Sequence, residues 1–163
     1  MPSIVHAIEI SRPPDEVFAY ATDPTRFAEW QDDVVSARIE PAGPPAAGAR
    51  IISTRRIART QFTQVQEITE TAPPRSWAVR GLEGPIRAHA RITVEPVGDG
   101  TAARVTFDLD FEGPGIGKLF VPQVRRIAAR QAPRSYQNLK ARLEGEELDP
   151  ERVDPGFPRS YKG

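Results

Sequence analysis

Histidine is the side chain best suited to proton transfer near neutral pH, and this chain has two histidines and no cysteine. His6 alternates with Ile4, Ile8 and Ile10, so on a strand it would share their apolar face. A polar side chain on an apolar face is an informative exception. The simpler interpretation is a hydrogen-bonded histidine of the core or the sheet end. The alternative is an acid or base in a pocket, which makes His6 a candidate catalytic residue.

His89 and Asp110 form the most tempting catalytic pair in the sequence. A turn over residues 98–101 would fold the flanking segments into a hairpin in which Ile92 lies opposite Phe107. Three polar pairs then follow one another on the other face: Arg91 with Asp108, His89 with Asp110, and Arg87 with Glu112. Such a series is typical of a solvated outer face that fixes the register, so it predicts a structural role for His89.

Gln64 and Gln66 alternate with Phe62 and Ile68 in a later segment. If these four side chains share the concave face of a sheet, the two amides could orient a ligand. If the strand is turned over, Val65 lies inside and both amides face water. The sequence leaves both alternatives open.

The last apolar-periodic segment contains two anomalies, Gln131 and Pro133. Its apolar stripe, which Gln131 interrupts, has helical spacing and consists of Phe120, Val124, Ile127, Leu139 and Leu143. Pro133 would remove one hydrogen bond and clash with the carbonyl of Ala129, so we expect a deformation after which the helix resumes. A deformation that borders a pocket would leave a polar carbonyl beside Gln131. The alternative is a helix that bends around the core with Gln131 bonded internally.

Recognised catalytic motifs are absent from the sequence: there is no GxSxG, HExxH, EF-hand loop or Walker motif. The segment Gly113-Pro-Gly-Ile-Gly117 has the neighbours of a phosphate loop but the wrong spacing, and it predicts a flexible entry into the long helix. Two histidines without cysteine or a close carboxylate cluster predict no metal site, and no cofactor is implied.

Length and charge limit the class of protein. The chain has 163 residues, which suits one domain, with 22 basic and 22 acidic side chains. A net charge of zero argues against a general nucleic-acid or membrane-surface binder. The basic run Arg125, Arg126, Arg130 and Arg134 is expected to be a solvated helix face. Neither a signal-peptide pattern nor a membrane span of roughly 20 apolar residues is found, so a cytoplasmic location is expected.

Periodicity and turn residues predict the elements that would position these side chains. A strand over residues 4–10 is followed by two short helices, the first opened by Pro13-Pro14-Asp15-Glu16 and the second beginning at Asp23-Pro24 and ending near Trp30. Six further strands are expected over residues 34–40, 50–58, 62–70, 76–82, 86–95 and 101–112, and a long helix over residues 118–144. This order predicts the α+β class in a domain over residues 1–144, followed by a polar, proline-containing tail over residues 145–163.

Four stretches form an ordered set along the chain: Ile8-Glu-Ile-Ser-Arg-Pro-Pro-Asp-Glu-Val-Phe-Ala-Tyr-Ala-Thr-Asp-Pro24, Phe27-Ala-Glu-Trp30, Val65-Gln-Glu-Ile-Thr-Glu-Thr-Ala-Pro-Pro74 and Leu139-Lys-Ala-Arg-Leu-Glu144. This set resembles the polyketide cyclase/dehydrase branch of the START-like (SRPBCC) superfamily, which shares its fold with a birch pollen allergen. The resemblance covers all but the tail and implies a helix-grip fold. In that fold a curved seven-stranded antiparallel sheet wraps around the long C-terminal helix, two short helices follow the first strand, and an apolar ligand cavity lies between sheet and helix.

The superfamily includes carriers and cyclising enzymes, so two functions are expected of such a cavity. The first is binding of an apolar or aromatic small molecule, as a carrier or sequestering protein. The second is a polyketide cyclase/dehydrase-type reaction, aldol cyclisation or dehydration, for which His6, Gln64, Gln66 and Tyr20 are the catalytic candidates. The residues expected at the ligand site are Trp30, Phe62, Gln64, Gln66, Trp77, Phe107, Leu109, Phe120, Val124, Ile127 and Gln131. No nucleic acid or integral membrane segment is expected, and the chain would be a monomer or a homodimer.

Overall fold

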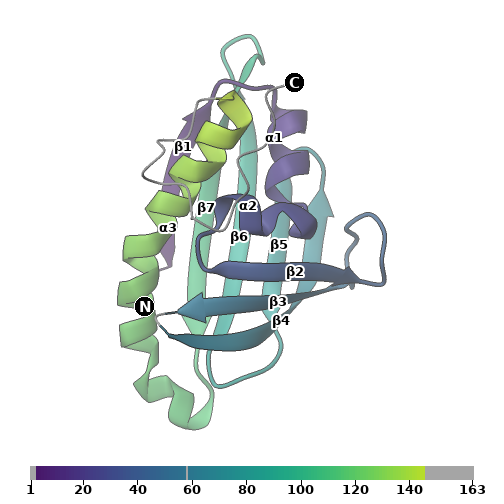
Figure 1. The fold of residues 1–163 in the computed structure, drawn as a ribbon. Helices are drawn as coiled ribbons and strands as arrows, with labels where there is room; N and C mark the ends of the chain where they lie inside the picture. The colour runs from purple at the N-terminus through teal and green to yellow at the C-terminus, as the bar shows by residue number, and fades with distance from the viewer. Residues whose placement is uncertain (1–2, 58, 146–163) are drawn as a thin grey trace, which may run out of the picture.

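The structure, a computed structural model, describes residues 3–57 and 59–145 (Figure 1). Its elements are β1 (Ile4–Ile10), α1 (Pro14–Ala21), η1 (Pro24–Arg26), α2 (Phe27–Trp30), β2 (Val34–Glu40), β3 (Arg50–Ile57), β4 (Thr60–Ala72), β5 (Ser76–Gly81), β6 (Arg87–Val97), β7 (Ala102–Glu112), η2 (Gly115–Leu119) and α3 (Val121–Glu144). The α+β class and the predicted strands are confirmed. The tail expected over residues 145–163 lies outside the described residues, apart from Gly145, and stays a prediction.

The seven strands form one antiparallel sheet in the order β1-β7-β6-β5-β4-β3-β2. The predicted register of the β6–β7 hairpin is confirmed, with Ile92 opposite Phe107 and His89 opposite Asp110. Its turn contains Gly98 and Gly100, whose φ angles of 61° and 88° lie in the region that glycine adopts without strain. A short turn of this kind fixes the register locally, which is why the sequence could predict it.

The two short helices close one end of the sheet. Proline begins α1, and the side chain of Asp23 accepts a hydrogen bond from the Thr25 backbone N–H at 3.0 Å at the start of η1. Both helices turn apolar side chains inward, and the most buried of them are Val17, Phe18, Ala21, Phe27 and Trp30. Trp30 therefore stands between the helices and the sheet.

The long helix α3 packs against β1, β7 and α2, and its C-terminal half contributes Ser135, Tyr136 and Leu139 to the buried interior. The sheet curves around this helix, as a helix-grip fold requires. Pro133 lies inside α3, so the helix resumes after the proline as predicted. Figure 1 also shows that α3 changes direction part-way along its length.

The start of α3 differs from the prediction. The helix begins at Val121 and not at residue 118, because the preceding residues form the separate turn η2. In this turn Gly117 is buried against the loop between β5 and β6, and the flexible entry stays a prediction. A Cβ atom at Gly117 would lie 1.9 Å from the carbonyl oxygen of Pro85. Only glycine permits this approach, and Pro122 then supports the first turn of the helix.

Candidate functional site

A cavity of about 410 Å³ lies between the concave face of the sheet and α3. Its lining includes the exposed residues Phe62, Glu83, Gly84 and Pro85, which places its mouth at the β3–β4 and β5–β6 connections. Of the eleven residues predicted for the ligand site, ten line this cavity: Trp30, Phe62, Gln64, Gln66, Trp77, Phe107, Leu109, Val124, Ile127 and Gln131.

Phe120 is the exception, and its predicted place in the cavity was wrong. It is 51% exposed at the junction of η2 and α3, outside the cavity lining. The prediction assumed a helix that already runs through residue 118. Because α3 begins only at Val121, Phe120 does not continue the helical stripe that turns Val124 and Ile127 toward the cavity.

An aromatic cluster forms one wall. Phe107 of β7 stacks on Tyr136 of α3, with ring centroids 3.7 Å apart. The ring of Trp30 lies beside the same Phe107, with ring centroids 6.2 Å apart. Phe27 and Trp77 meet edge to face at 6.2 Å beside them. Aromatic faces of this kind suit a flat, apolar ligand.

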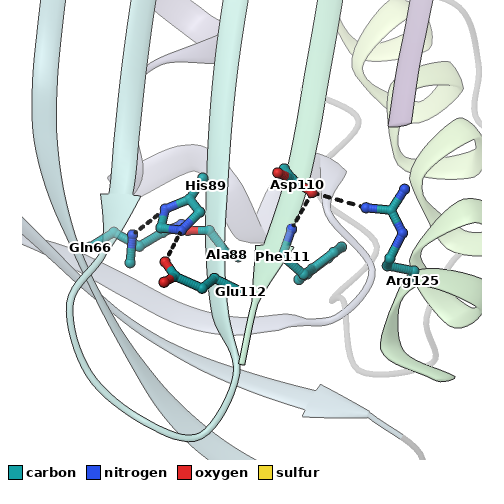
Figure 2. A network of polar contacts seen from close by, with 8 residues as sticks. Gln66, Ala88, His89, Asp110, Phe111, Glu112 and Arg125 are labelled. Carbon is teal, nitrogen blue, oxygen red and sulfur yellow. Dashed lines mark hydrogen bonds and ion pairs between the residues drawn. The ribbon is translucent and has the colours of Figure 1, made fainter. Parts of the chain in front are cut away.

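The two glutamines of β4 face inward, which decides the alternative that the sequence left open. Gln66 is buried, and its amide donates to the Ala88 carbonyl at 3.0 Å, so it joins β4 to β6 at the level where β5 ends (Figure 2). Gln64 is equally buried and lines the cavity, but among the described residues its amide has no hydrogen-bond partner. Gln66 therefore stabilises the contact between β4 and β6, whereas the amide of Gln64 is available to a ligand.

Tyr136 is a site residue that the sequence analysis missed. Burial, together with the negative charge of Asp108, raises the pKa of its phenol above the ordinary value, so the hydroxyl stays protonated at neutral pH. No hydrogen-bond partner of this hydroxyl is found in the described part of the chain. Tyr136 is three residues before Leu139 of the apolar stripe, so the same helical spacing could have identified it from the sequence.

Arg55 of β3 is a second residue that was missed. It donates to Gln31 Oε1 at 3.1 Å and to Asp33 Oδ2 at 2.8 Å, and all three residues line the cavity. Ile51, Ser53 and Arg55 are two residues apart along β3, so strand alternation places them on one face and could have identified Arg55 as a lining residue. Since Asp33 balances the charge of Arg55, this corner of the cavity carries no net formal charge.

His89 and Asp110 lie opposite each other on the outer face but do not form a dyad (Figure 2). Nδ1 of His89 accepts from the Gly81 backbone N–H at 3.2 Å, so Nε2 is the atom that donates to Glu112, at 3.1 Å. Asp110 instead pairs with Arg125 at 2.9 Å. The predicted register was right and the predicted side-chain partners were wrong. Glu112 is the diagonal neighbour of His89 in the twisted hairpin, and Asp110 is reached by Arg125 from α3.

The same contact corrects the expectation for the basic run on α3. The Arg125 side chain is only 15% exposed and is held by Asp110, so it is not part of a solvated face. Arg126 and Arg130 are exposed as predicted, and exposed Arg134 pairs with Asp32 at 3.3 Å.

The remaining catalytic candidates lie outside the cavity lining. The ring of His6 packs on Tyr136 with centroids 5.6 Å apart, which fits a histidine at the edge of the core. The hydroxyl of Tyr20 donates to Glu29 at 3.1 Å. Neither residue faces the space that a ligand would occupy.

Metal and membrane features can be assessed over residues 3–57 and 59–145. This part of the chain brings together no group of three or more histidine, aspartate or glutamate side chains that could hold a metal ion. None of its helices combines the length and apolar character needed to span a bilayer.

Comparison with protein families agrees with the architecture of the site. The family described as "Polyketide cyclase / dehydrase and lipid transport" matches residues 1–144. The chain belongs to this family. Membership places it among hydrophobic ligand-binding or cyclase-type proteins. No curated protein sequence matches the chain.

Solved structures share the fold of this family member at low sequence identity. The di-domain aromatase/cyclase BexL from the BE-7585A biosynthetic pathway is 17% identical, with a TM-score of 0.70 over 88% of this chain, which spans about half (47%) of the BexL chain. A START superfamily protein from Mycobacterium smegmatis is 14% identical (TM-score 0.68, 89% of this chain and 99% of that one). Major latex-like protein 151 from Panax ginseng is 13% identical (TM-score 0.67, 86% and 96%).

Proposed function

We propose that this protein binds an apolar or aromatic small molecule in the cavity between sheet and α3, as a carrier or sequestering protein. The observation that carries the proposal is the cavity of about 410 Å³, a size typical of small-molecule sites. Its lining is largely apolar and aromatic, with the Phe107–Tyr136 stack on one side and Ile127 of α3 nearby. Such a surface gains free energy chiefly by removing apolar ligand area from water.

Polar groups in the cavity narrow the class of ligand. Gln64 offers an amide and Tyr136 a protonated hydroxyl, and neither has a partner among the described residues. The positive charge of Arg55 is already balanced by Asp33, so a carboxylate would find no unpaired cation here. These groups support a neutral, flat ligand with one or two keto or hydroxyl oxygens.

A polyketide cyclase/dehydrase-type reaction is the second candidate function, and Tyr136 is the observation that favours it. A protonated phenol on the cavity wall could donate to the oxygen of a developing enolate. The reaction also needs a base beside the α-hydrogen of a ketone. His6 and Tyr20 lie outside the lining, Asp33 is bound to Arg55, and Glu83 is exposed at the mouth. Asp108 is therefore the lining carboxylate that this reaction would have to use as its base, and the proposal gives precedence to the carrier.

Intrinsic fluorescence gives a direct test of ligand binding. Trp30 and Trp77 are the two tryptophans of the chain, and both line the cavity. Titration with 2-naphthol or anthrone, both flat and neutral, should quench tryptophan emission to saturation, and each should displace a fluorescent naphthalene dye. Ala128→Phe would fill the cavity and abolish the quenching. Its neighbour Ala129 is exposed and outside the lining, so Ala129→Phe is the matched control and should bind like the wild type.

A turnover assay separates the two candidate functions. A carrier returns a β-hydroxyketone probe unchanged, whereas a dehydrase converts it to the enone with loss of one water, which mass spectrometry detects. Conversion that depends on Tyr136 would replace the carrier proposal by the enzymatic one. If no flat neutral probe quenched either tryptophan, both the carrier function and the cyclase/dehydrase function would be refuted.

A further inference from the structure

We propose that the end of the domain around the cavity mouth docks on an anionic lipid bilayer through the exposed apolar side chains of Ile116, Leu119 and Phe120. The proposal goes beyond small-molecule binding, since docking needs no ligand in the cavity. It rests on the exposure of these side chains, on their position and on the charges around them.

Exposure of the three side chains is the first observation. Ile116 is 74% exposed, Leu119 77% and Phe120 51%. Six large apolar residues are exposed within the described part of the chain, and three of them lie in this one stretch of five residues. Single exposed apolar residues are ordinary on protein surfaces, but a cluster of them marks an interaction site.

The stretch is held in place at the mouth. Gly117 is buried against the carbonyl of Pro85, and Gly113 is so close to Val121 that a Cβ would lie 2.7 Å from its Cγ2 atom. Pro85 itself lines the cavity. In Figure 1 the connection from β7 to α3 lies at the bottom of the molecule with the β5–β6 connection, at the end opposite the β6–β7 hairpin. The exposed side chains therefore stand beside the opening through which a ligand would pass.

Charge around the stretch favours an anionic surface. Residues 111–130 contain four basic side chains and one acidic one, although the whole chain is neutral. Arg125 forms an ion pair with Asp110, but Lys118, Arg126 and Arg130 are exposed. Arg126 and Arg130 are four residues apart and thus on one side of α3, outside the cavity lining. A net charge of zero argues against a surface binder only when the charges are evenly spread.

Two exposed carboxylates oppose these cations near the mouth. Glu83 belongs to the β5–β6 connection, and Glu112 is hydrogen-bonded to His89 on the outer face of the sheet. The three exposed cations outnumber them, so an anionic surface is still attracted to this end.

A bilayer fits these features better than a protein partner does. Ile116 and Leu119 project from a turn, and lipid accepts projecting side chains without a matching pocket. Apolar insertion next to basic residues is the combination by which peripheral proteins bind anionic membranes. A bilayer is also a medium in which an apolar ligand dissolves, so docking at the mouth would shorten the path of the ligand through water.

Co-sedimentation of the full chain with vesicles tests the proposal. Vesicles of phosphatidylcholine and phosphatidylglycerol in a ratio of about three to one are compared with phosphatidylcholine alone. The wild-type chain should bind the anionic vesicles and lose binding at high salt. The triple variant Ile116→Ser, Leu119→Ser, Phe120→Ser should lose about tenfold or more in affinity, and Arg126→Gln with Arg130→Gln several-fold.

The matched control is Val5→Ser with Val35→Ser, because these exposed apolar residues lie in β1 and β2, away from the proposed surface. The control should bind vesicles like the wild type, and all variants should keep the wild-type circular dichroism spectrum because only exposed side chains change. No vesicle binding by the wild type, or equal binding by the triple variant, overturns the proposal and leaves a protein partner as the occupant of this surface.

Discussion

The ring of Tyr136 on α3 lies flat on the ring of Phe107 on β7, with the two planes inclined by 9°. This stack joins the long helix to β7, the neighbour of the edge strand β1, and Trp30 and His6 also contact the pair. Tyr136 lines the cavity as well. One side chain therefore combines a structural role, carried by its ring, with a polar group that the fold itself does not use.

Replacements of Tyr136 should separate these two roles. Tyr136→Phe keeps the stack and removes a hydroxyl without a described partner, so the free energy of unfolding should change by less than about 1 kcal/mol. Affinity for anthrone should fall several-fold, while affinity for anthracene, which has no oxygen, should not change. Tyr136→Ala should destabilise the fold by about 3–5 kcal/mol. Denaturant unfolding and fluorescence titration measure both quantities, and equal affinity losses for the two probes would contradict a polar role.

Gln64 and Gln66 should respond differently to the same substitution. Gln66→Leu leaves the Ala88 carbonyl without its donor and should cost about 1–3 kcal/mol of stability. Gln64→Leu removes no described hydrogen bond, so stability should be unchanged or higher, and the preference for ligands that carry oxygen should weaken. Denaturant unfolding compares the two variants directly. Equal destabilisation of both would show that Gln64 also has a structural partner.

His89→Gln should change neither the stability of the fold nor ligand affinity by much. The imidazole makes two hydrogen bonds on a partly exposed surface, one with Gly81 and one with Glu112, and such contacts contribute at most about 1 kcal/mol. Ligand affinity should be unchanged, because His89 does not line the cavity. A hundredfold loss of binding or turnover in the fluorescence or mass-spectrometric assay would mean that this face is functional after all.

Pro133→Ala tests whether the proline shapes the cavity. Alanine restores one backbone hydrogen bond and should stabilise α3, by up to about 3 kcal/mol if the fold does not compensate for the proline. Gln131 and Ser135 flank position 133 and both line the cavity, so a straighter helix should also change the relative affinities of ligands of different size. Unfolding curves and competition titrations measure the two effects. A more stable variant with unaltered ligand preference would show that the proline is merely tolerated.

Alkaline pH should weaken the fold through Tyr20. Burial, and then the neighbouring Glu29 carboxylate, raise the pKa of Tyr20 from 10.0 to about 12. The folded state thus favours the protonated phenol, and this stabilisation is complete below pH 10 and is lost as the pH rises from 10 toward 12. Tyr20→Phe should therefore show a shallower loss of stability over this range. Denaturation midpoints and phenolate absorbance measured against pH check this, and parallel curves for variant and wild type would contradict it.

Local patterns determined most of the architecture from the sequence alone. Alternation gave the strands, Asp23 and the following proline marked the second short helix, and the glycine turn at residues 98–101 set Ile92 opposite Phe107. Each of these features depends on residues close together in the chain, so its physical cause can be seen in a short window. Apolar periodicity likewise led to the ten of the eleven predicted ligand-site residues that line the cavity, because residues that avoid water on one face of an element must meet the facing element.

Tertiary structure alone decided which side chains meet. Alternation fits either orientation of a strand, so the inward direction of Gln64 was settled only by the pairing of β4 with β3 and β5. His89 pairs with Glu112, its diagonal neighbour across the hairpin, and Asp110 pairs with Arg125 of α3. The contact of Gly117 with a distant loop kept Phe120 out of the cavity. These outcomes depend on residues far apart in the chain, whose distances are set only when the whole sheet has closed around α3.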